Sequence, residues 1–303
     1  MKIIKRLVPF TVGIALLTVP YTHNNLKKIY QQTKNVIVEE YENTISKFQV
    51  KPTEINWEEK IDREVNEIKK AALEDALSNE EILTGYGLSL DEVRMYFTLK
   101  KYKKKIEKYA EVLKSKELVP YYLALLYGES SGRPFVKSKH NAYGLFQIKY
   151  EGAFSWAWEF LNNQKEMKKY PEIANLLSDF KGSKKEVWEK VKTNPDMNIR
   201  LGMAYLYFCF KKDNDISEAL KDYGVGTLGK KQNPEIAEKY VIYIENIEDR
   251  ISDLFEKIEE VRKREERYLE DIILPQIREE LENEREEKMY EVYSKIWGVK
   301  EKK

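Results

Sequence analysis

Apolar residues recur at intervals of three and four through much of this chain, which is the spacing of one face of an α-helix. The longest such seam consists of Ile244, Ile247, Ile251, Leu254, Ile258, Val261, Tyr268 and Ile272, with Glu265 as its polar interruption. A seam of this length predicts a long helix that packs in coiled-coil fashion against another helix. Pro275 is expected to kink or end it.

Shorter amphipathic segments precede this seam. The apolar positions of residues 30–48 and 57–77 follow helical spacing, with a break at residues 49–53. Ser-x-x-Glu capping boxes begin at Ser89 and Ser183, and strand signals are scarce. The pattern therefore predicts an all-α fold. The N- and C-terminal helices pair either with each other or with a second chain, and the sequence leaves both arrangements open.

One carboxyl group stands at the end of the most apolar segment of the central region. Residues 119–128 form an apolar run, Pro120 suits the first turn of a helix, and Glu129 is followed closely by Gly132 and Pro134, which end helices. Glu129 is therefore expected in the last helical turn, half buried. Desolvation and the negative end of the helix dipole both raise the pKa of a carboxyl group there, which suits a proton donor near neutral pH.

The segment after Glu129 contains residues suited to contact a polar ligand. Ser138 lies in it, and Gly144 precedes an apolar pair that ends at Gln147. Glycine lets a backbone approach a ligand closely, and a glutamine amide offers both donors and acceptors to a sugar.

Four blocks in a fixed order resemble the signature of the soluble lytic transglycosylases, whose catalytic domain is of the goose-lysozyme type. The matching residues are Glu129 and Ser130 with Ser138 and Gly-Leu-Phe-Gln at 144–147, then Asn-Ile-Arg-Leu-Gly-Met-Ala-Tyr-Leu at 198–206, Ala-Leu-Lys-Asp-Tyr-Gly-Val-Gly at 219–226, and Tyr240 with Val241. The resemblance covers roughly residues 117–246, which is under half of the chain.

This resemblance implies cleavage of the β-1,4 bond between N-acetylmuramic acid and N-acetylglucosamine in peptidoglycan. Glu129 would serve as both acid and base, a 1,6-anhydro end would form, and neither a cofactor nor a metal would be needed. Ser138 would hydrogen-bond near the acid, Gln147 would contact the sugar, Tyr223 would orient Glu129 or the sugar, and Tyr240 would join the substrate-binding set.

The resemblance also implies a division of the chain. A lysozyme-like transglycosylase domain at residues 116–246 would be flanked by a helical N-terminal region at 23–115 and a long charged helix at 247–303. That last helix could bind a protein partner or a second copy of the chain. Residues 1–22 place basic residues before the apolar run 7–19, which is typical of a signal peptide or an N-terminal membrane anchor. The expected location is the periplasm or cell envelope, with inner-membrane attachment if the segment is retained.

Three departures from the family pattern keep alternatives open. Phe146 replaces a methionine, Lys149 with Tyr150 replaces a pair ending in proline, and Gly224 replaces an asparagine. A lysozyme-like hydrolase would need a second carboxylate, for which Glu151 and Asp222 are the candidates. A protein that binds peptidoglycan without cleaving it is the third reading. Trp156, Trp158 and Trp188 either line the substrate groove or fill a helical core.

Composition excludes some partners and adds little else. The chain has 53 basic and 52 acidic residues, a net charge of +1, so overall charge does not favour nucleic acid. The single cysteine, Cys209, lies in an apolar run and is expected to be buried rather than bonded.

Overall fold

The structure is a computed structural model that describes residues 57–283 and residue 286. These residues form an all-α fold with helices α2 to α12, short 3₁₀ and π-helical turns, and no strand within the described part, which confirms the predicted fold class. The segment at 30–48 and the apolar run at 7–19 lie outside the described residues. Among those that are described, no helix is long and apolar enough to cross a membrane.

The chain divides into two compact units. We call Asp91–Glu256 the central unit, and we call the described residues up to Leu90 and from Lys257 the terminal unit. The central unit contains the predicted catalytic segment 116–246 together with almost all of α4 (Leu90–Leu113) and the first part of α12 (Pro234–Tyr268). All of the predicted site residues belong to the central unit.

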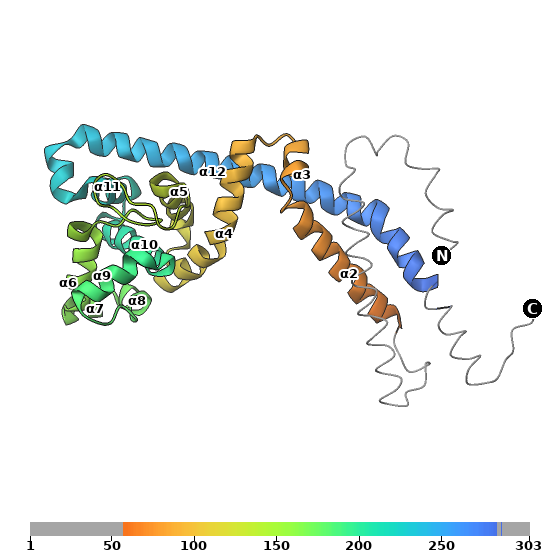
Figure 1. The fold of residues 1–303 in the computed structure, drawn as a ribbon, viewed down its shortest axis with the longest axis horizontal. Helices are drawn as coiled ribbons and strands as arrows, with labels where there is room; N and C mark the ends of the chain where they lie inside the picture. Colours follow the sequence, from red (N-terminus) through yellow and green to blue (C-terminus); the bar gives the residue numbers. More distant parts are fainter. Residues whose placement is uncertain (1–56, 284–285, 287–303) are drawn as a thin grey trace, which may run out of the picture. The chain divides into compact units, whose positions relative to one another are not determined.

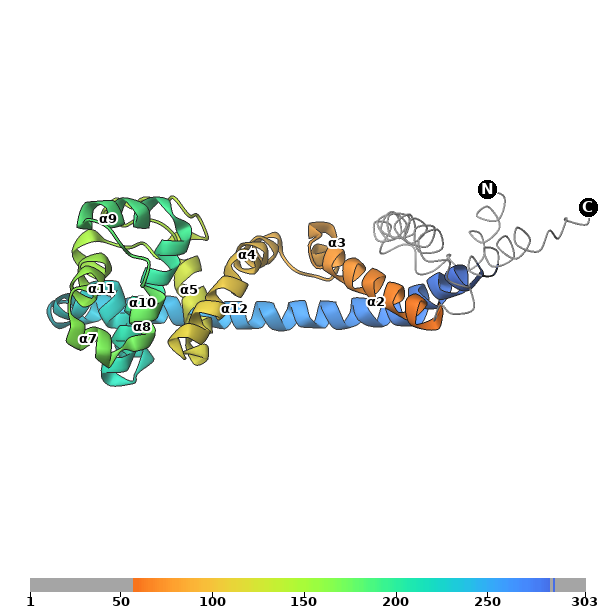
Figure 2. The ribbon, with the colours of Figure 1, turned by 90° about the horizontal axis from the view of Figure 1, so that it is seen from below.

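The terminal unit buries the amphipathic face of α2 (Trp57–Ala76) against the C-terminal part of the chain. An apolar cluster joins the two segments, from Ile61, Val65, Ile68 and Ala72 on one side to Leu269, Leu274, Ile277 and Leu281 on the other. At its edge the Lys69 ammonium group contacts the carboxylates of Glu266 and Glu270, at 2.7 and 2.6 Å. Figure 2 shows α2 in orange beside the blue end of the long helix. In this unit the C-terminal seam thus packs against a helix of the same chain.

The end of the seam differs from the prediction. Tyr268 is only partly buried and Ile272 is 46% exposed, whereas Leu269 is buried. A π-helical turn at Leu269–Ile273 follows α12, and helical residues continue from 274 to 283, so Pro275 does not end the helix. The ring of a proline clashes with the carbonyl four residues earlier in an α-helix, and the wider turn just before it relieves that clash. The extra residue in this turn shifts the buried positions to Leu274 and Ile277.

The polar interruption of the seam is buried and paired. Glu265 is 3% exposed, and its carboxylate accepts a hydrogen bond of 2.6 Å from the hydroxyl of Tyr86. Tyr86 directly follows α3 (Glu80–Gly85), a short helix whose N-terminus is capped by the side chain of Asn79. Glu265 is therefore a specific contact between α3 and α12 inside the terminal unit.

The core of the central unit is built around α10 (Pro195–Asp213). This helix buries residues on nearly every side, because it packs against α6 (Ser155–Leu161), α8 (Pro171–Leu176), α9 (Lys184–Thr193) and α11 (Ile216–Gln232). Figure 1 shows α10 in the middle of this group, with α5 (Val119–Ser130) and α7 (Gln164–Lys169) also part of the unit. The side chains of Asn194 and Asp215 cap α10 and α11. The capping box predicted at Ser183 is confirmed at the start of α9.

Trp156 and Trp188, two of the tryptophans between residues 150 and 198, pack in aromatic clusters. Trp156 contacts the rings of Phe160, Tyr205 and Phe208, with centroids 4.8 to 5.7 Å apart. Trp188 lies 4.9 to 5.5 Å from the rings of Tyr143, Tyr150 and Phe154. Trp156 and Trp188 are both partly buried, so each belongs to a packed aromatic cluster and also keeps an exposed side. Cys209 is buried in α10, as expected.

Candidate active site

Glu129 lies in the last turn of α5, where the sequence places it. Proline occupies the first turn, and the helix ends because Ser131 adopts a left-handed conformation with φ of 51°, from which its N–H donates to the carbonyl of Tyr127 at 2.7 Å. Gly132 follows with φ of 74°, and a Cβ there would lie 2.0 Å from Cγ2 of Thr98. The chain therefore turns sharply just beyond the carboxyl group, and only glycine fits that turn.

The surroundings of Glu129 only partly offset the cost of burying its carboxylate. Its Oε1 accepts a hydrogen bond from the hydroxyl of Tyr240. Burial raises the pKa of Glu129, while the Tyr240 hydrogen bond and the positive charge of Lys149 lower it, and the net direction is upward. The residue as a whole remains partly exposed. A proton donor that works near neutral pH needs this combination.

Tyr240 and Tyr223 occupy different positions in the site. Tyr240 contacts the acid directly, whereas the Tyr223 hydroxyl donates a hydrogen bond of 2.8 Å to the carbonyl of Phe146. Burial, and then the charge of Glu129, raise the pKa of both phenols well above the ordinary value. Both hydroxyls thus stay neutral donors at physiological pH. Tyr223 fixes the loop beside the acid, and Tyr240 holds the acid.

Gln147 and Ser138 shape the loop between α5 and the turn at Tyr150–Phe154. Gln147 has φ of 45°, and its amide nitrogen donates to the carbonyls of Gly144 at 2.8 Å and Val136 at 3.3 Å. The Ser138 hydroxyl accepts from the N–H groups of Ala142 at 3.1 Å and His140 at 3.3 Å. Each of these side chains therefore stabilises loop backbone. No described interaction joins Ser138 to Glu129.

The side chain of Asn198, on α10, holds the backbone of the loop that contains Gly144 and Gln147. Sequence reasoning did not predict this role. It is 1% exposed, its Oδ1 accepts from the N–H of Phe146 at 2.9 Å, and its Nδ2 donates to the carbonyl of Tyr143 at 2.9 Å. Gly144, with φ of 77°, leaves room for this amide, because a Cβ there would lie 2.4 Å from Nδ2. The available signal was an asparagine among the apolar positions of α10, since a buried amide must find partners.

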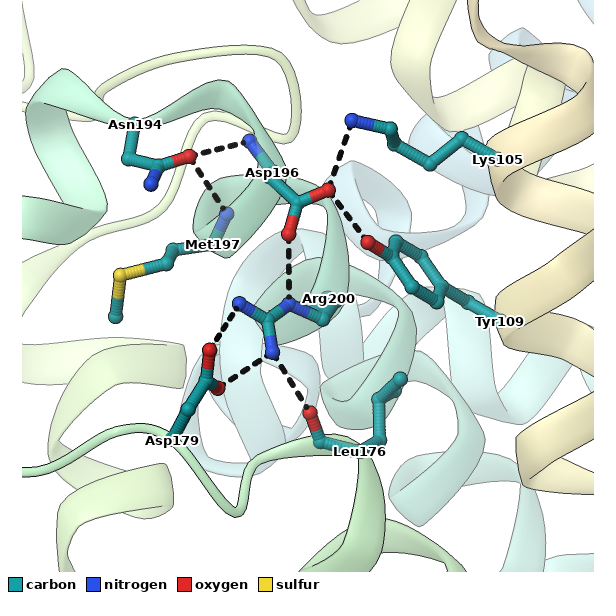
Figure 3. A network of polar contacts seen from close by, with 8 residues as sticks. All are labelled: Lys105, Tyr109, Leu176, Asp179, Asn194, Asp196, Met197 and Arg200. Atoms are coloured by element: carbon teal, nitrogen blue, oxygen red, sulfur yellow. Dashed lines mark hydrogen bonds and ion pairs between the residues drawn. The ribbon is translucent and has the colours of Figure 1, made fainter.

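Arg200 belongs to the same sequence block as Asn198 but to a different network, shown in Figure 3. Its guanidinium group binds both carboxylate oxygens of Asp179, at 2.5 and 2.9 Å, and Oδ2 of Asp196 at 3.0 Å. Asp196 also contacts the ammonium group of Lys105 at 2.8 Å and the hydroxyl of Tyr109 at 2.5 Å. The network ties α10 to α4 and to the segment after α8.

Two further residues near Glu129 were missed by sequence reasoning. Tyr243 is 49% exposed, and its hydroxyl donates to the carbonyl of Gly128 at 3.0 Å, one residue before the acid. Lys149 is exposed at the end of the loop, and its charge acts on Glu129. Tyr243 follows Tyr240 by three positions on α12, which places both on neighbouring parts of one helix face. That spacing was the signal for Tyr243; Lys149 was noted only as a departure from a motif.

The two candidates for the second carboxylate of a hydrolase differ from Glu129 in their surroundings, since one is paired with lysines and the other is exposed. Asp222 is 3% exposed, and its carboxylate pairs with the ammonium groups of Lys230 at 2.8 Å and Lys212 at 3.7 Å. Glu151 is exposed in the turn at Tyr150–Phe154. Within the described ranges, no group of histidine, cysteine and acidic residues is arranged to hold a metal ion.

Comparison with known proteins gave no match to a protein-family model, to a curated protein or to a solved structure.

Proposed function

We propose that this chain is a peptidoglycan lytic transglycosylase in which Glu129 acts as the single general acid and base. The observation that carries the proposal is the state of Glu129: a buried carboxyl group with a raised pKa, on a partly exposed residue, that accepts a hydrogen bond from a neutral tyrosine beside a glycine-containing loop. The sequence blocks that resemble the soluble transglycosylases supply the substrate class.

The reaction needs two proton transfers at one carboxyl group. Protonated Glu129 donates its proton to the glycosidic oxygen as the bond from that oxygen to C1 breaks, so the leaving sugar departs as an alcohol. The resulting carboxylate then accepts the proton of the C6 hydroxyl as that oxygen attacks C1. The product carries a 1,6-anhydro bridge, and Glu129 is protonated again for the next turnover.

Lys149 and Tyr240 oppose the effect of burial on the protonation of Glu129. Both favour the carboxylate that exists between the two transfers, while burial favours the protonated form that starts the reaction.

Tyr243 suits a sugar-binding role beside the acid. Its ring is half exposed, and its position is fixed at both ends, by α12 and by the hydrogen bond to the Gly128 carbonyl. A rigid exposed aromatic ring packs against the apolar face of a pyranose with little loss of conformational entropy. We include Tyr243 in the substrate-binding set together with Gln147, while Tyr223, Tyr240 and Ser138 support the acid and the loop.

The hydrolase alternative receives less support from the described residues. A second carboxylate would have to lie about 5 to 9 Å from the acid across the bond. The Asp222 carboxylate is occupied by lysines, and Glu151 faces solvent at the loop. The non-enzymatic binding alternative predicts no need for a raised carboxyl pKa.

The test is a product analysis with the full chain. Purified peptidoglycan is incubated with the wild type, with Glu129→Gln, and with Glu151→Gln as a matched control at an exposed carboxylate, and the soluble products are read by mass spectrometry. Anhydro-muropeptides from the wild type and the control, but not from Glu129→Gln, are expected. Products heavier by one water would make the protein a hydrolase, and retained glycan binding without products would favour the binding role.

A further inference from the structure

Gly224 lies where α11 meets the ring of Tyr240. A Cβ added at this position would lie 2.4 Å from Cδ1, 2.5 Å from Cε1 and 2.7 Å from Cγ of that ring. These distances are far below van der Waals contact, and the atoms approached belong to a rigid ring rather than to the end of a flexible side chain. The backbone of Gly224 is not in the left-handed region, so the space it leaves is what matters here.

The Tyr240 ring connects this contact to the acid. Its hydroxyl donates to Oε1 of Glu129, and its side chain reaches from α12 across the space that Gly224 leaves. α5 approaches α12 closely as well, since a Cβ at Gly128 would lie 3.0 Å from Cδ1 of Ile247 and 3.1 Å from Cδ1 of Ile244. Gly224 therefore sets the place of the Tyr240 ring, and Gly128 lets α5 lie close to the turns of α12 that follow Tyr240.

We propose that Gly224 is a positioning residue for the acid, because the absence of a side chain there seats the Tyr240 hydroxyl on the carboxyl group of Glu129. The assignment of a catalytic purpose to this contact rests on the proposed function. It also gives a physical meaning to one departure from the family pattern: the asparagine expected at position 224 has no room beside Tyr240 as this chain places it.

The consequence of filling the space can be stated with its sign. An alanine at position 224 displaces the Tyr240 ring and weakens its hydrogen bond to Glu129. That hydrogen bond lowers the pKa of Glu129, so its loss raises the pKa further. A misplaced acid also costs up to about 10²-fold in kcat, as a displacement near 1 Å does, while KM depends on other contacts.

The experiment is a titration of Glu129 in the full chain, followed through its side-chain carboxyl ¹³C signal and assigned by its loss in Glu129→Gln. The variants are Gly224→Ala and Tyr240→Phe, with Gly85→Ala as the matched control, because a Cβ at Gly85 meets nothing within 4 Å. We expect the first two to raise the pKa of Glu129 and the control to leave it unchanged. An unchanged titration in folded Gly224→Ala would overturn the proposal.

Loss of folding in Gly224→Ala is handled by a second variant. In Gly224→Ala combined with Tyr240→Ala the ring is absent, so recovery of the thermal unfolding transition supports the contact and no recovery overturns it. The titration needs no substrate. A chain that cleaves no glycan therefore contradicts the proposed function alone, and the pH profile of kcat, with its alkaline limb at higher pH in Gly224→Ala, adds a readout where cleavage occurs.

Discussion

Two acidic sites of the central unit show opposite responses to their surroundings. At Glu129 a neutral tyrosine hydroxyl contacts the carboxyl group, and burial raises its pKa. At Asp196 burial also acts, but the hydrogen bonds from Lys105 and Tyr109 and the charge of Arg200 outweigh it and lower the pKa. The pKa of Asp179 is lowered chiefly by its hydrogen bond with Arg200.

The difference separates a carboxyl group with a raised pKa from carboxylates that are held ionised. A carboxylate in contact with a guanidinium group stays ionised and serves as a fixed tie between helices. A carboxyl group that is buried and whose contact partner is neutral has a raised pKa instead. Glu129 and Arg200, the guanidinium partner of Asp196, both lie in blocks that resemble one family signature, whereas Asp179 and Asp196 lie outside them. The sequence blocks alone therefore do not distinguish a carboxyl group with a raised pKa from an ion-pair network. The contact partners of each carboxyl group make that distinction.

The largest expected effect is on the rate of glycan cleavage. Glu129→Gln should lower kcat by about 10²- to 10⁴-fold, the usual contribution of a general acid. Its stability should not fall, since the uncharged amide removes the cost of burying a carboxylate. The ratio of product formed by the variant and by the wild type measures the first expectation. A variant that keeps more than a tenth of the activity would remove Glu129 from the mechanism.

The contribution of Glu129 to the free energy of unfolding should fall as the pH rises. Its folded pKa lies above the ordinary 4.5, so the wild type loses stability as the pH rises from that value to the raised pKa. Glu129→Gln lacks this loss. Thermal melts should therefore show the variant gaining on the wild type as the pH rises through this window, and parallel curves would contradict the raised pKa.

The next effect is on the free energy of unfolding. The Arg200 side chain is 12% exposed, and Arg200→Ala removes the guanidinium partner of Asp196 and Asp179, which should cost about 1.5 to 3 kcal/mol. Urea unfolding measures this loss of stability. Arg94→Ala is the control, because the Arg94 side chain is 72% exposed and its contact with Asp91 is long, at 3.8 Å. Equal losses in the two variants would show that the network carries no special stability.

The Arg200 network should respond to acid in the opposite direction to Glu129. Because the folded pKa values of Asp179 and Asp196 are lowered, the network stabilises the fold above the ordinary value of 3.8 and loses this contribution as the pH falls through the folded values. The gap between wild type and Arg200→Ala should shrink there. A gap that stays constant into strong acid would assign the loss to packing.

A smaller effect is expected at the exposed aromatic ring. Tyr243→Ala should raise KM about 3- to 10-fold, since an aromatic contact contributes about 0.5 to 1.5 kcal/mol. Ile242→Ala, at a neighbouring position that is 51% exposed, is the control. Steady-state kinetics on soluble glycan fragments measure both. If KM is unchanged while kcat falls, Tyr243 acts on the acid through Gly128 and not on the sugar.

The smallest effect concerns the cation that acts on Glu129. Lys149→Met removes a charge that lowers the pKa of Glu129, so the pKa should rise and the alkaline limb of the pH–rate profile should move to higher pH. Lys139→Met, in the same loop, is the control. Added salt should reduce the difference between wild type and Lys149→Met, because exposed charges are screened. A shift toward lower pH would reverse the assigned role.

Local signals predicted the helices and the place of the acid well. The position of Glu129 followed from Pro120 and Gly132, and the start of α9 followed from Ser183, because caps and breakers act within one turn. The seam failed near Tyr268, since a π-helical turn changes the phase of the helix without a distinct residue pattern. The partners of the acid could not be derived from periodicity, because Tyr240 reaches Glu129 across 111 positions of sequence.

The hydrogen bond between Tyr86 and Glu265 fixes the register in which α3 packs along α12. The long seam offers isoleucine, leucine and valine at repeated intervals, so an apolar surface that packs on it could slide by a turn and meet nearly the same chemistry. Glu265 breaks that equivalence. A slide by one turn would leave a buried carboxylate without its donor, at a cost of about 1 to 3 kcal/mol, so one polar pair favours a single alignment of α3 on α12.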